Sequence, residues 1–329
     1  MGPSMVSGWK AALSVAAFVA TATAWSVPTM AAWPERPVTL IVIAGAGGGS
    51  DFTMRLLARE LEARTGQPFT VVNQAQGGGV VGMTTYVKAR PDGYTLGQLS
   101  PFAQYRLLGQ ADFTAASYSP VAQFNADPAA IHVAKGSRFQ GVPDIIAALK
   151  KDPGSLKISC GGTCNASWDI PFVSLLLDQG VDVSKVNLIP APGSAAGLQE
   201  LAAGGVDVVL CSLPETDALT AAGRVRSVGV MSGKRLDRYP AVPTVGEQVG
   251  RTYEGGTWRA IAGPAGMDPA LVAAIEDAVK AAYESERFQK GMKERGFGLQ
   301  WRGSAELAAF LKEHEAMTER VINAVGYKK

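Results

Sequence analysis

Apolar and polar positions divide the chain into short apolar runs and longer stretches with helical periodicity. Residues 38–44, VTLIVIA, form a continuous β-branched run, which is typical of a strand buried on both faces of a parallel sheet. Beyond a glycine-rich turn, apolar side chains recur at helical spacing at Met54, Leu57 and Leu61, and Gly66 would end that helix. The pattern predicts a buried strand followed by a helix.

The same unit recurs along the chain. Residues 68–74, PFTVVNQ, predict a second strand, which a glycine cluster and a helix follow, and a Pro-Asp-Gly turn precedes a third strand ending at Ser100. This βαβαβ order indicates a parallel sheet with right-handed crossovers. A second set of strand–helix units, from residues 131–137 to residues 225–232, predicts a second sheet.

The last part of the chain has a different pattern. Residues 258–266, WRAIAGPAG, predict one more strand, and residues 269–328 predict two or three helices. Two sets of α/β units without a long flexible linker indicate two lobes with a cleft between them. Ligands of open α/β sheets bind at the carboxyl ends of strands, which is where the glycine turns lie.

The first 32 residues are unlike the rest. Lys10 precedes the short apolar stretch 11–25, and the small residues Ala31 and Ala32 follow before Trp33. The stretch is shorter than the roughly 20 apolar residues that a membrane span requires. We therefore expect a secretory signal peptide over residues 1–32, cleaved near Trp33, and an exported, soluble monomer; a membrane anchor is the alternative.

The overall charge narrows the classes of partner. The 329 residues carry a formal net charge of +2, and 18% of them are charged. This is ordinary globular composition without the basic excess of a nucleic-acid-binding protein. We expect no nucleic-acid partner.

Residues 41–51, IVIAGAGGGSD, end the first predicted strand in a glycine-rich turn. Such turns let the backbone approach a ligand closely, and the free N–H groups at the start of a helix form an anion site. Ser50 stands where the dinucleotide motif G-x-G-x-x-G needs its last glycine, and no Gly-Lys-Ser/Thr follows for a phosphate loop. The turn therefore predicts an anion site, or only a tight turn before a helix that Ser50 or Asp51 caps.

Catalytic chemistry has little support in the sequence. The only histidines are His132, in a predicted strand, and His314, on a charged helix, and both are expected to be structural. Cys160 or Ser159 would be a nucleophile without a base partner, and no carboxylate pair is placed for acid–base work. We expect no enzyme activity, no cofactor and no metal; a periplasmic hydrolase using Cys160 or Ser159 is the alternative.

Three cysteines and two tryptophans leave alternatives open. Cys160 and Cys211 each end a predicted strand, which favours a disulfide between neighbouring strands, whereas Cys160 could instead pair with Cys164 across the turn, or all three could stay reduced. They are too few for a metal site without a histidine. Trp168 and Trp258 lie near strand ends, either in the core or as an apolar wall for a ligand.

Several segments together resemble one known family. They include GGGSD, GQPFTVVNQAQGGGVVG, ARPDGYTL, GLQELAAGGVDVVL and GTWRAIAGPAGMDPALV. Their order and spacing resemble the Bug-type substrate-binding proteins of tripartite tricarboxylate transporters, the TctC family, over nearly the whole mature chain.

This resemblance implies an α/β type II periplasmic binding-protein fold with two doubly wound lobes. Residues 33–125 and 230–329 would form the first lobe and residues 126–229 the second. The chain would capture a small organic acid in the cleft by lobe closure and deliver it to the membrane subunits of a tripartite permease. A sensory module that presents the ligand to a signalling receptor is a further alternative.

The resemblance also implies the site residues. In this family two strand-to-helix turns of the first lobe hold a ligand carboxylate through backbone amides, and second-lobe turns complete the cleft. The expected first-lobe residues, with Trp258 added, are Ala46, Gly47, Gly48, Gly49, Ser50, Asp51, Gln76, Gly77, Gly78, Ser100 and Trp258. The expected second-lobe residues are Ser159, Cys160, Gly161, Thr163, Cys164, Asn165, Trp168, Pro192, Gly193 and Ser212.

Three turns depart from the family pattern. The first turn reads IAGA where the family commonly has prolines, the second reads NQAQGG in place of Arg-Pro-Gly-Ala-Gly-Gly, and the second-lobe turn carries Cys160, Cys164, Asn165 and Trp168 where a Gly-Ser and a histidine are usual. These departures concern the identity of the ligand.

Overall fold

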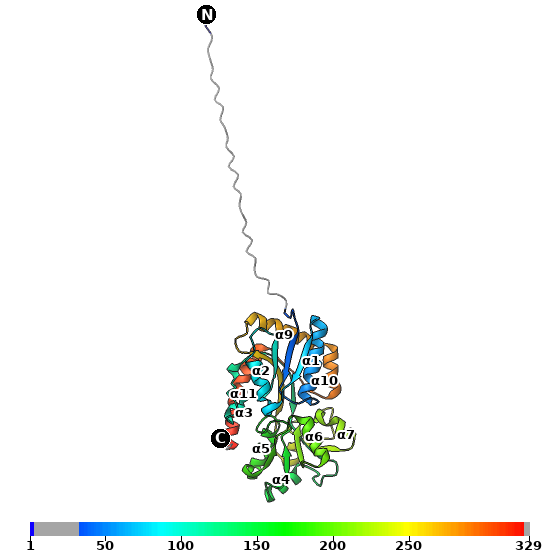
Figure 1. Ribbon diagram of the computed structural model, residues 1–329. Helices are drawn as coiled ribbons and strands as arrows, with labels where there is room; N and C mark the ends of the chain where they lie inside the picture. The colour runs from blue at the N-terminus through cyan, green and yellow to red at the C-terminus, as the bar shows by residue number, and fades with distance from the viewer. Residues whose placement is uncertain (3–32, 326–329) are drawn as a thin grey trace. The chain divides into compact units, whose positions relative to one another are not determined.

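The computed structural model describes residues 1–2 and 33–325 (Figure 1). The predicted signal peptide, apart from its first two residues, lies outside the described residues. No helix of the described chain has the length and apolar character needed to cross a membrane.

The first sheet has six strands in the order β11-β4-β10-β3-β1-β2. Strands β1 to β3 are parallel, as the sequence predicts, whereas β10 inserts antiparallel between β3 and β4. The bounds are β1 Val38–Val42, β2 Phe69–Asn73, β3 Thr95–Leu99, β4 Tyr118–Pro128, β10 Gly256–Pro264 and β11 Leu299–Arg302.

Helices cover both faces of this sheet, because alternate side chains of a strand point to opposite faces. Val38, Leu40 and Val42 of β1 join one apolar cluster, and Ile41 joins another. The helices around the first sheet are α1 Gly49–Thr65, α2 Val80–Val87, α3 Ala103–Leu107, α9 Pro269–Tyr283, α10 Glu286–Arg295 and α11 Ser304–Val325. We call the first sheet with these helices the first lobe.

The second sheet has five strands in the order β7-β6-β8-β5-β9. Its strands are β5 Ala130–Ala134, β6 Lys157–Ser159, β7 Asn187–Ile189, β8 Val208–Cys211 and β9 Val225–Val230. Its helices are α4 Val142–Lys151, α5 Asp169–Asp178, α6 Ser194–Ala203, α7 Asp217–Ala221 and α8 Val245–Val249. This second lobe has an apolar core of its own, and Ala130, Leu213 and Val230 form a small separate cluster beside it. Two sheets flanked by helices confirm the predicted α/β class.

Short 3-10 turns join some of these elements: η1 Gln76–Gly79, η2 Ala115–Ser117, η3 Val183–Lys185 and η4 Leu213–Thr216.

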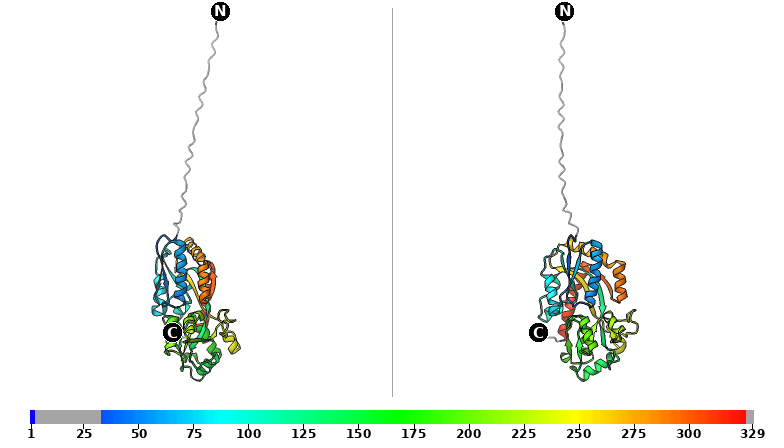
Figure 2. Two further views of the ribbon diagram at one scale, coloured as in Figure 1. Left: turned by 90° about the vertical axis from the view of Figure 1, so that its right-hand side faces the viewer. Right: turned by 45° about the vertical axis from the view of Figure 1, so that its right-hand side comes forward.

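The chain passes between the two sheets at two places, from β4 to β5 through Ala129 and again between β9 and β10. The boundary that the sequence puts at residue 125 therefore falls inside β4. In Figure 2 the blue and orange-red segments, from both ends of the described chain, gather around the first sheet, and the green segments gather around the second.

Strands β4 and β11 are not among the predicted elements. The apolar pattern of β4 is interrupted by prolines at 120 and 128 and by the polar residues Gln123, Asn125 and Asp127. All three polar side chains are nevertheless buried. Strand β11 lies in a segment for which the sequence predicts only helices. Both strands are fixed by distant partners, since β4 pairs with β10 and β11.

Candidate functional site

A cavity lies between the two lobes at the ends of their strands. Turns after β1, β2 and β3 face turns after β6, β7 and β8, and Thr257 and Arg259 of β10 complete the lining. The space is about 700 Å3, its open mouth included. Ten of the predicted site residues line it: Gly48, Gly49, Ser50, Gly78, Ser100, Gly161, Thr163, Trp168, Pro192 and Gly193.

Four helix starts reach this cavity. Gly49 is the first residue of α1, Ser194 is the first residue of α6, Trp168 directly precedes α5, and Gly78 lies in the turn η1 that leads into α2. Each helix start presents N–H groups without an intrahelical partner and the positive end of the helix dipole. The cavity can therefore stabilise negative charge.

The first glycine turn is organised by its own aspartate. The N–H of Gly47 donates to Asp51 Oδ2 at 3.0 Å, and Asp51 Oδ1 lies 2.8 Å from Nε of Arg55. Gly48 is the N-cap of α1 and no side chain of the turn itself caps this helix, so the expectation that Ser50 or Asp51 caps it is wrong. The Ser50 hydroxyl instead accepts hydrogen bonds from Gln98 Nε2 and Arg259 Nε, at 3.0 and 3.2 Å.

The second glycine turn needs glycine for its backbone. Gly77, Gly78 and Gly79 have φ values of 60°, 64° and 96°, which side-chain-bearing residues rarely adopt. The Gly78 carbonyl accepts hydrogen bonds from the Thr163 hydroxyl and the Tyr105 hydroxyl, each at 2.6 Å. Burial raises the pKa of Tyr105 to about 12, so its hydroxyl keeps the proton that it donates.

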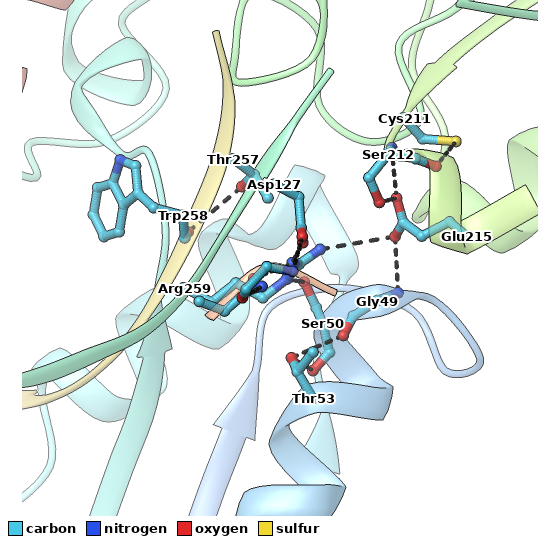
Figure 3. A network of polar contacts seen from close by, with 12 residues as sticks. Gly49, Ser50, Thr53, Asp127, Cys211, Ser212, Glu215, Thr257, Trp258 and Arg259 are labelled. Atoms are coloured by element: carbon cyan, nitrogen blue, oxygen red, sulfur yellow. Dashed lines mark hydrogen bonds and ion pairs between the residues drawn. The ribbon is translucent and has the colours of Figure 1, made fainter. Parts of the chain in front are cut away.

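A buried charged network borders the cavity (Figure 3). Arg259 is 1% exposed, and its Nη1 lies 2.5 Å from Asp127 Oδ2 and also bonds Asn125 Oδ1. Burial raises the pKa of Asp127, and the nearby guanidinium of Arg259 lowers it in part. The Nη2 of Arg259 lies 3.8 Å from Oε1 of Glu215, which comes from the second lobe.

Glu215 connects the two lobes. Its Oε1 accepts hydrogen bonds from the Gly49 N–H at 2.8 Å and from the Ser194 hydroxyl at 2.6 Å. Its Oε2 accepts from the N–H and hydroxyl of Ser212, at 3.0 and 2.9 Å. Both carboxylate oxygens therefore have two hydrogen-bond donors.

A disulfide closes the second-lobe loop, and it joins Cys160 to Cys164. The favoured pairing of Cys160 with Cys211 is wrong, and Cys211 is a free, buried thiol. The reason is register: the last paired residues of β6 and β8 are Ser159 and Val209, so Cys160 does not lie opposite Cys211. The predicted alternative across the turn is the one that forms.

Asp169 holds the far end of this loop. Its carboxylate accepts the N–H groups of Asn165 and Ala166, at 2.6 and 2.9 Å, and Asn165 has a φ of 60°. Burial raises the pKa of Asp169 to about 6, while these N–H donors lower it in part. The loop between Cys160 and Asp169 is therefore shaped by a covalent bond at one end and a buried carboxylate at the other.

The remaining predicted residues lie outside the cavity lining. Trp258 packs in the core, with its ring edge-on to Phe310 and His314 at 5.3 and 5.4 Å, so it forms no wall of the cavity. Ser212 lies behind Glu215 and caps the turn η4. The other predicted residues that are not in the lining are Ala46, Gly47, Asp51, Gln76, Gly77, Ser159, Cys160, Cys164 and Asn165.

Sequence reasoning missed Arg259 and Glu215, as well as Gln104 and Tyr105, which also line the cavity. A signal existed for Glu215, because Ser212 and Glu215 form an S-x-x-E capping box just after a buried strand. Arg259 is a single cation inside an otherwise apolar strand, and a buried cation needs a partner.

The two histidines make their contacts elsewhere than at Cys160 and Ser159, the candidate nucleophiles. His132 Nε2 lies 3.1 Å from the Cys211 carbonyl and Nδ1 lies 2.9 Å from the Ser227 hydroxyl, inside the second sheet. Burial lowers the pKa of both His132 and His314 to about 4. Cys160 is oxidised in its disulfide, and no histidine is part of the described cavity lining.

Comparisons with known proteins agree on one family. Residues 53–327 match the family described as the tripartite tricarboxylate transporter family receptor, TctC. Protein BugT of Bordetella pertussis is 27% identical over 285 residues, which are 85% of this chain and 86% of that protein.

Two solved structures are also similar. A TctC solute-binding protein from Polaromonas, solved without ligand, is 27% identical with a TM-score of 0.63 and covers 89% of this chain and 99% of its own. The Rpa4515 protein of R. palustris, solved with adipate, is 26% identical with a TM-score of 0.82 and covers 89% of this chain and 98% of its own.

Proposed function

This chain belongs to the tripartite tricarboxylate transporter receptor family, and from that premise we propose that it captures a small organic acid in the cavity between its lobes and delivers it to a tripartite membrane permease. Its role as a solute-binding receptor, with the two-lobed α/β fold of periplasmic binding proteins, follows from the family and the similar structures. The identity of the ligand, the permease and the monomeric state belong to the proposal.

One observation carries the proposal most directly. Four helix starts, those of α1, α2, α5 and α6, converge on one cavity at the carboxyl ends of the strands. N–H groups and helix dipoles directed at one space favour an anion. The relative solved with adipate, a dicarboxylic acid, supports a carboxylate as that anion.

The described conformation is proposed to be the closed state. The Gly45 N–H donates to the Pro192 carbonyl at 2.9 Å, and Thr163 bonds Gly78, so the lobes contact one another directly. The chain also superimposes better on the relative solved with adipate than on the relative without ligand. Capture would shift a population of open molecules towards this state, because closure completes contacts from both lobes.

Export is the second part of the proposal. The signal-peptide pattern over residues 1–32 and the family's periplasmic members support a periplasmic protein cleaved near Trp33. Edman sequencing of the protein from a periplasmic extract should begin at or close to Trp33. Recovery only in the membrane fraction, with Lys10 retained, would contradict it.

A thermal-shift screen of organic acids tests the binding function. A ligand that binds only the native state raises the melting temperature, and at 100 times its Kd it adds about 2.7 kcal/mol to the free energy of unfolding. We expect at least one small organic acid to give such a shift and to be recovered unchanged. Chemical conversion of the acid would favour the hydrolase alternative, and growth on the acid after deletion of the protein would separate transport from sensing.

A further inference from the structure

The anion position at the start of α1 is already filled by the chain itself. The Gly49 N–H, which the sequence assigns to a ligand carboxylate, donates at 2.8 Å to Oε1 of Glu215. The Ser194 hydroxyl, at the start of α6, donates to the same oxygen at 2.6 Å. One internal carboxylate therefore lies between helix starts of both lobes, as Figure 3 shows for its contacts with Gly49 and Ser212.

This position has no room for a second carboxylate. A carbon atom added to Gly49 as a Cβ would lie 2.7 Å from Oε1 of Glu215 and 2.7 Å from Nη2 of Arg259. The Glu215 side chain is 4% exposed and both its oxygens are hydrogen-bonded. A ligand could occupy this place only by breaking those bonds.

The charges around the cavity favour a single ligand charge. The charged side chains of the lining are Glu215 and Arg259, and Arg259 is already paired with Asp127 at 2.5 Å. The start of α2 differs from that of α1, since no acidic residue lies in the first turn of η1 or α2. One ligand carboxylate can therefore face the second glycine turn, whereas another would find no unpaired cation in the described part of the lining.

A second cavity continues from the first in the direction of α11. The two share Pro101, Gln104, Ala166 and Ser167, and the surface of the second is mainly apolar, with Ile170, Pro171 and Met317 in its lining. Its charged lining residue is Glu254, and burial lowers the pKa of His314 to about 4, so this imidazole is neutral at pH 7. Among the described residues, this cavity also offers no cation to a carboxylate.

Gln104 lies at the junction of the two cavities. Its Nε2 donates to the Pro101 carbonyl at 3.0 Å, which fixes the amide, and its Oε1 is buried without a hydrogen-bond partner. The residue is 1% exposed. Gln104 therefore marks the boundary between the polar first cavity and the mainly apolar second cavity.

We infer that Glu215 acts as a built-in second carboxylate, so that this receptor selects acids with one carboxylate and an apolar remainder over dicarboxylates and tricarboxylates. The inference rests on the proposed function, because it specifies the ligand of the same cavity. Glu215 is a specificity-determining residue here, since a like charge brought next to a buried carboxylate is strongly disfavoured.

Matched pairs of acids test the inference on the mature, wild-type protein. Butyrate against succinate, hexanoate against adipate, and benzoate against terephthalate differ mainly in the second carboxylate. Calorimetry should show the monocarboxylate binding at least about tenfold more tightly in the pair that fits best. Equal or tighter binding of the dicarboxylate would overturn the inference and leave the proposed function standing. If neither these six acids nor any other organic acid binds, both are overturned.

Substitution of Glu215 provides a second test of the inference. Glu215→Ala vacates a position lined by the Gly49 N–H and the Ser194 and Ser212 hydroxyls, so acetate alone should raise the melting temperature of the variant, and the preference should move towards the dicarboxylate by about tenfold or more. Asp217→Ala is the matched control, because it removes the same charge from α7, where Asp217 bonds Arg238 and Tyr239. An unchanged preference in a folded Glu215→Ala protein would overturn the inference; should that variant not fold, the wild-type pairs decide.

Discussion

The hydroxyl of Thr163 donates a hydrogen bond of 2.6 Å to the carbonyl of Gly78, and this bond joins the disulfide-closed loop of the second lobe to the second glycine turn of the first. It is formed only when the lobes are together. Its contribution should therefore appear in ligand affinity and hardly in the stability of either lobe.

Replacing Thr163 with valine tests this separation. Thr163→Val keeps the shape of the side chain and removes the donor, so the closed state should lose about 1 kcal/mol, or roughly fivefold in affinity. Thr163→Ser keeps the hydroxyl and should bind nearly as the wild type does. Calorimetry with any acid that the wild type binds measures both, and equal affinity of the valine and wild-type proteins would show that the bond is not used for closure.

The two neighbouring glycines Gly77 and Gly78 form a matched pair. Both have positive φ, so alanine strains the backbone by roughly 1–2 kcal/mol at either position. A Cβ on Gly78 would lie 2.7 Å from Thr163 Oγ1, whereas a Cβ on Gly77 would only approach Val80 at 3.7 Å. We expect similar losses of melting temperature in Gly78→Ala and Gly77→Ala but a loss of affinity, about tenfold or more, only in the first. Equal affinities of the two variants would contradict the placement of Gly78 at the contact between the lobes.

The cysteine pairing predicts a defined thiol count. Alkylation in denaturant should label one thiol, that of Cys211, without reductant and three thiols after reduction, as intact mass will show. Loss of so short a loop closure lowers the free energy of unfolding by about 2 kcal/mol, and the freed loop should also weaken ligand binding. The Cys160→Ser/Cys164→Ser variant should behave as the reduced protein does. Three labelled thiols before reduction would contradict the disulfide.

His132 predicts a pH dependence of stability. The Cys211 carbonyl can only accept, so Nε2 carries the proton and Nδ1 accepts from Ser227. Burial lowers the pKa of His132 to about 4, below the unfolded value of roughly 6.5. The native state therefore binds fewer protons than the unfolded state between these values, and the free energy of unfolding falls as the pH falls from 6.5 towards 4.

The effect can be isolated by comparison with His132→Gln, which keeps an amide donor for the Cys211 carbonyl. The wild type should lose up to about 3 kcal/mol more than the variant between pH 7 and pH 4, since one pKa unit corresponds to about 1.4 kcal/mol. Urea unfolding at several pH values measures both proteins. Parallel pH profiles would mean that His132 is protonated in the folded state or exposed to water.

Elements with local causes are predictable from the sequence. Strand β1 is an uninterrupted β-branched run, and helix α1 ends at Gly66 in the left-handed conformation. The glycine turns follow such strands, so their position at the strand ends is a consequence of the same pattern. The periodicity of side chains is sufficient for these elements because it depends on neighbours within a few positions.

Features with distant causes are not predictable in this way. Strand β4 has an irregular polar pattern, and only its pairing with β10, where Arg259 lies opposite Asn125, explains why its polar side chains are buried. Glu215 meets Gly49 across 166 positions of sequence, and the contact exists only because the two lobes meet at the cavity. The exclusion of Cys211 as a partner of Cys160 depends on the register of β6 and β8, which spacing alone leaves open.

The order of strands has a consequence for folding during synthesis on the ribosome. The chain is synthesised from its amino end, and all five strands of the second sheet have been made once Val230 is added. The first sheet still lacks β10, the strand that links β3 to β4, and it stays in two pieces until Pro264 emerges. The lobe that begins first is thus completed last, and a nascent chain stopped before β10 carries both glycine turns but no cleft.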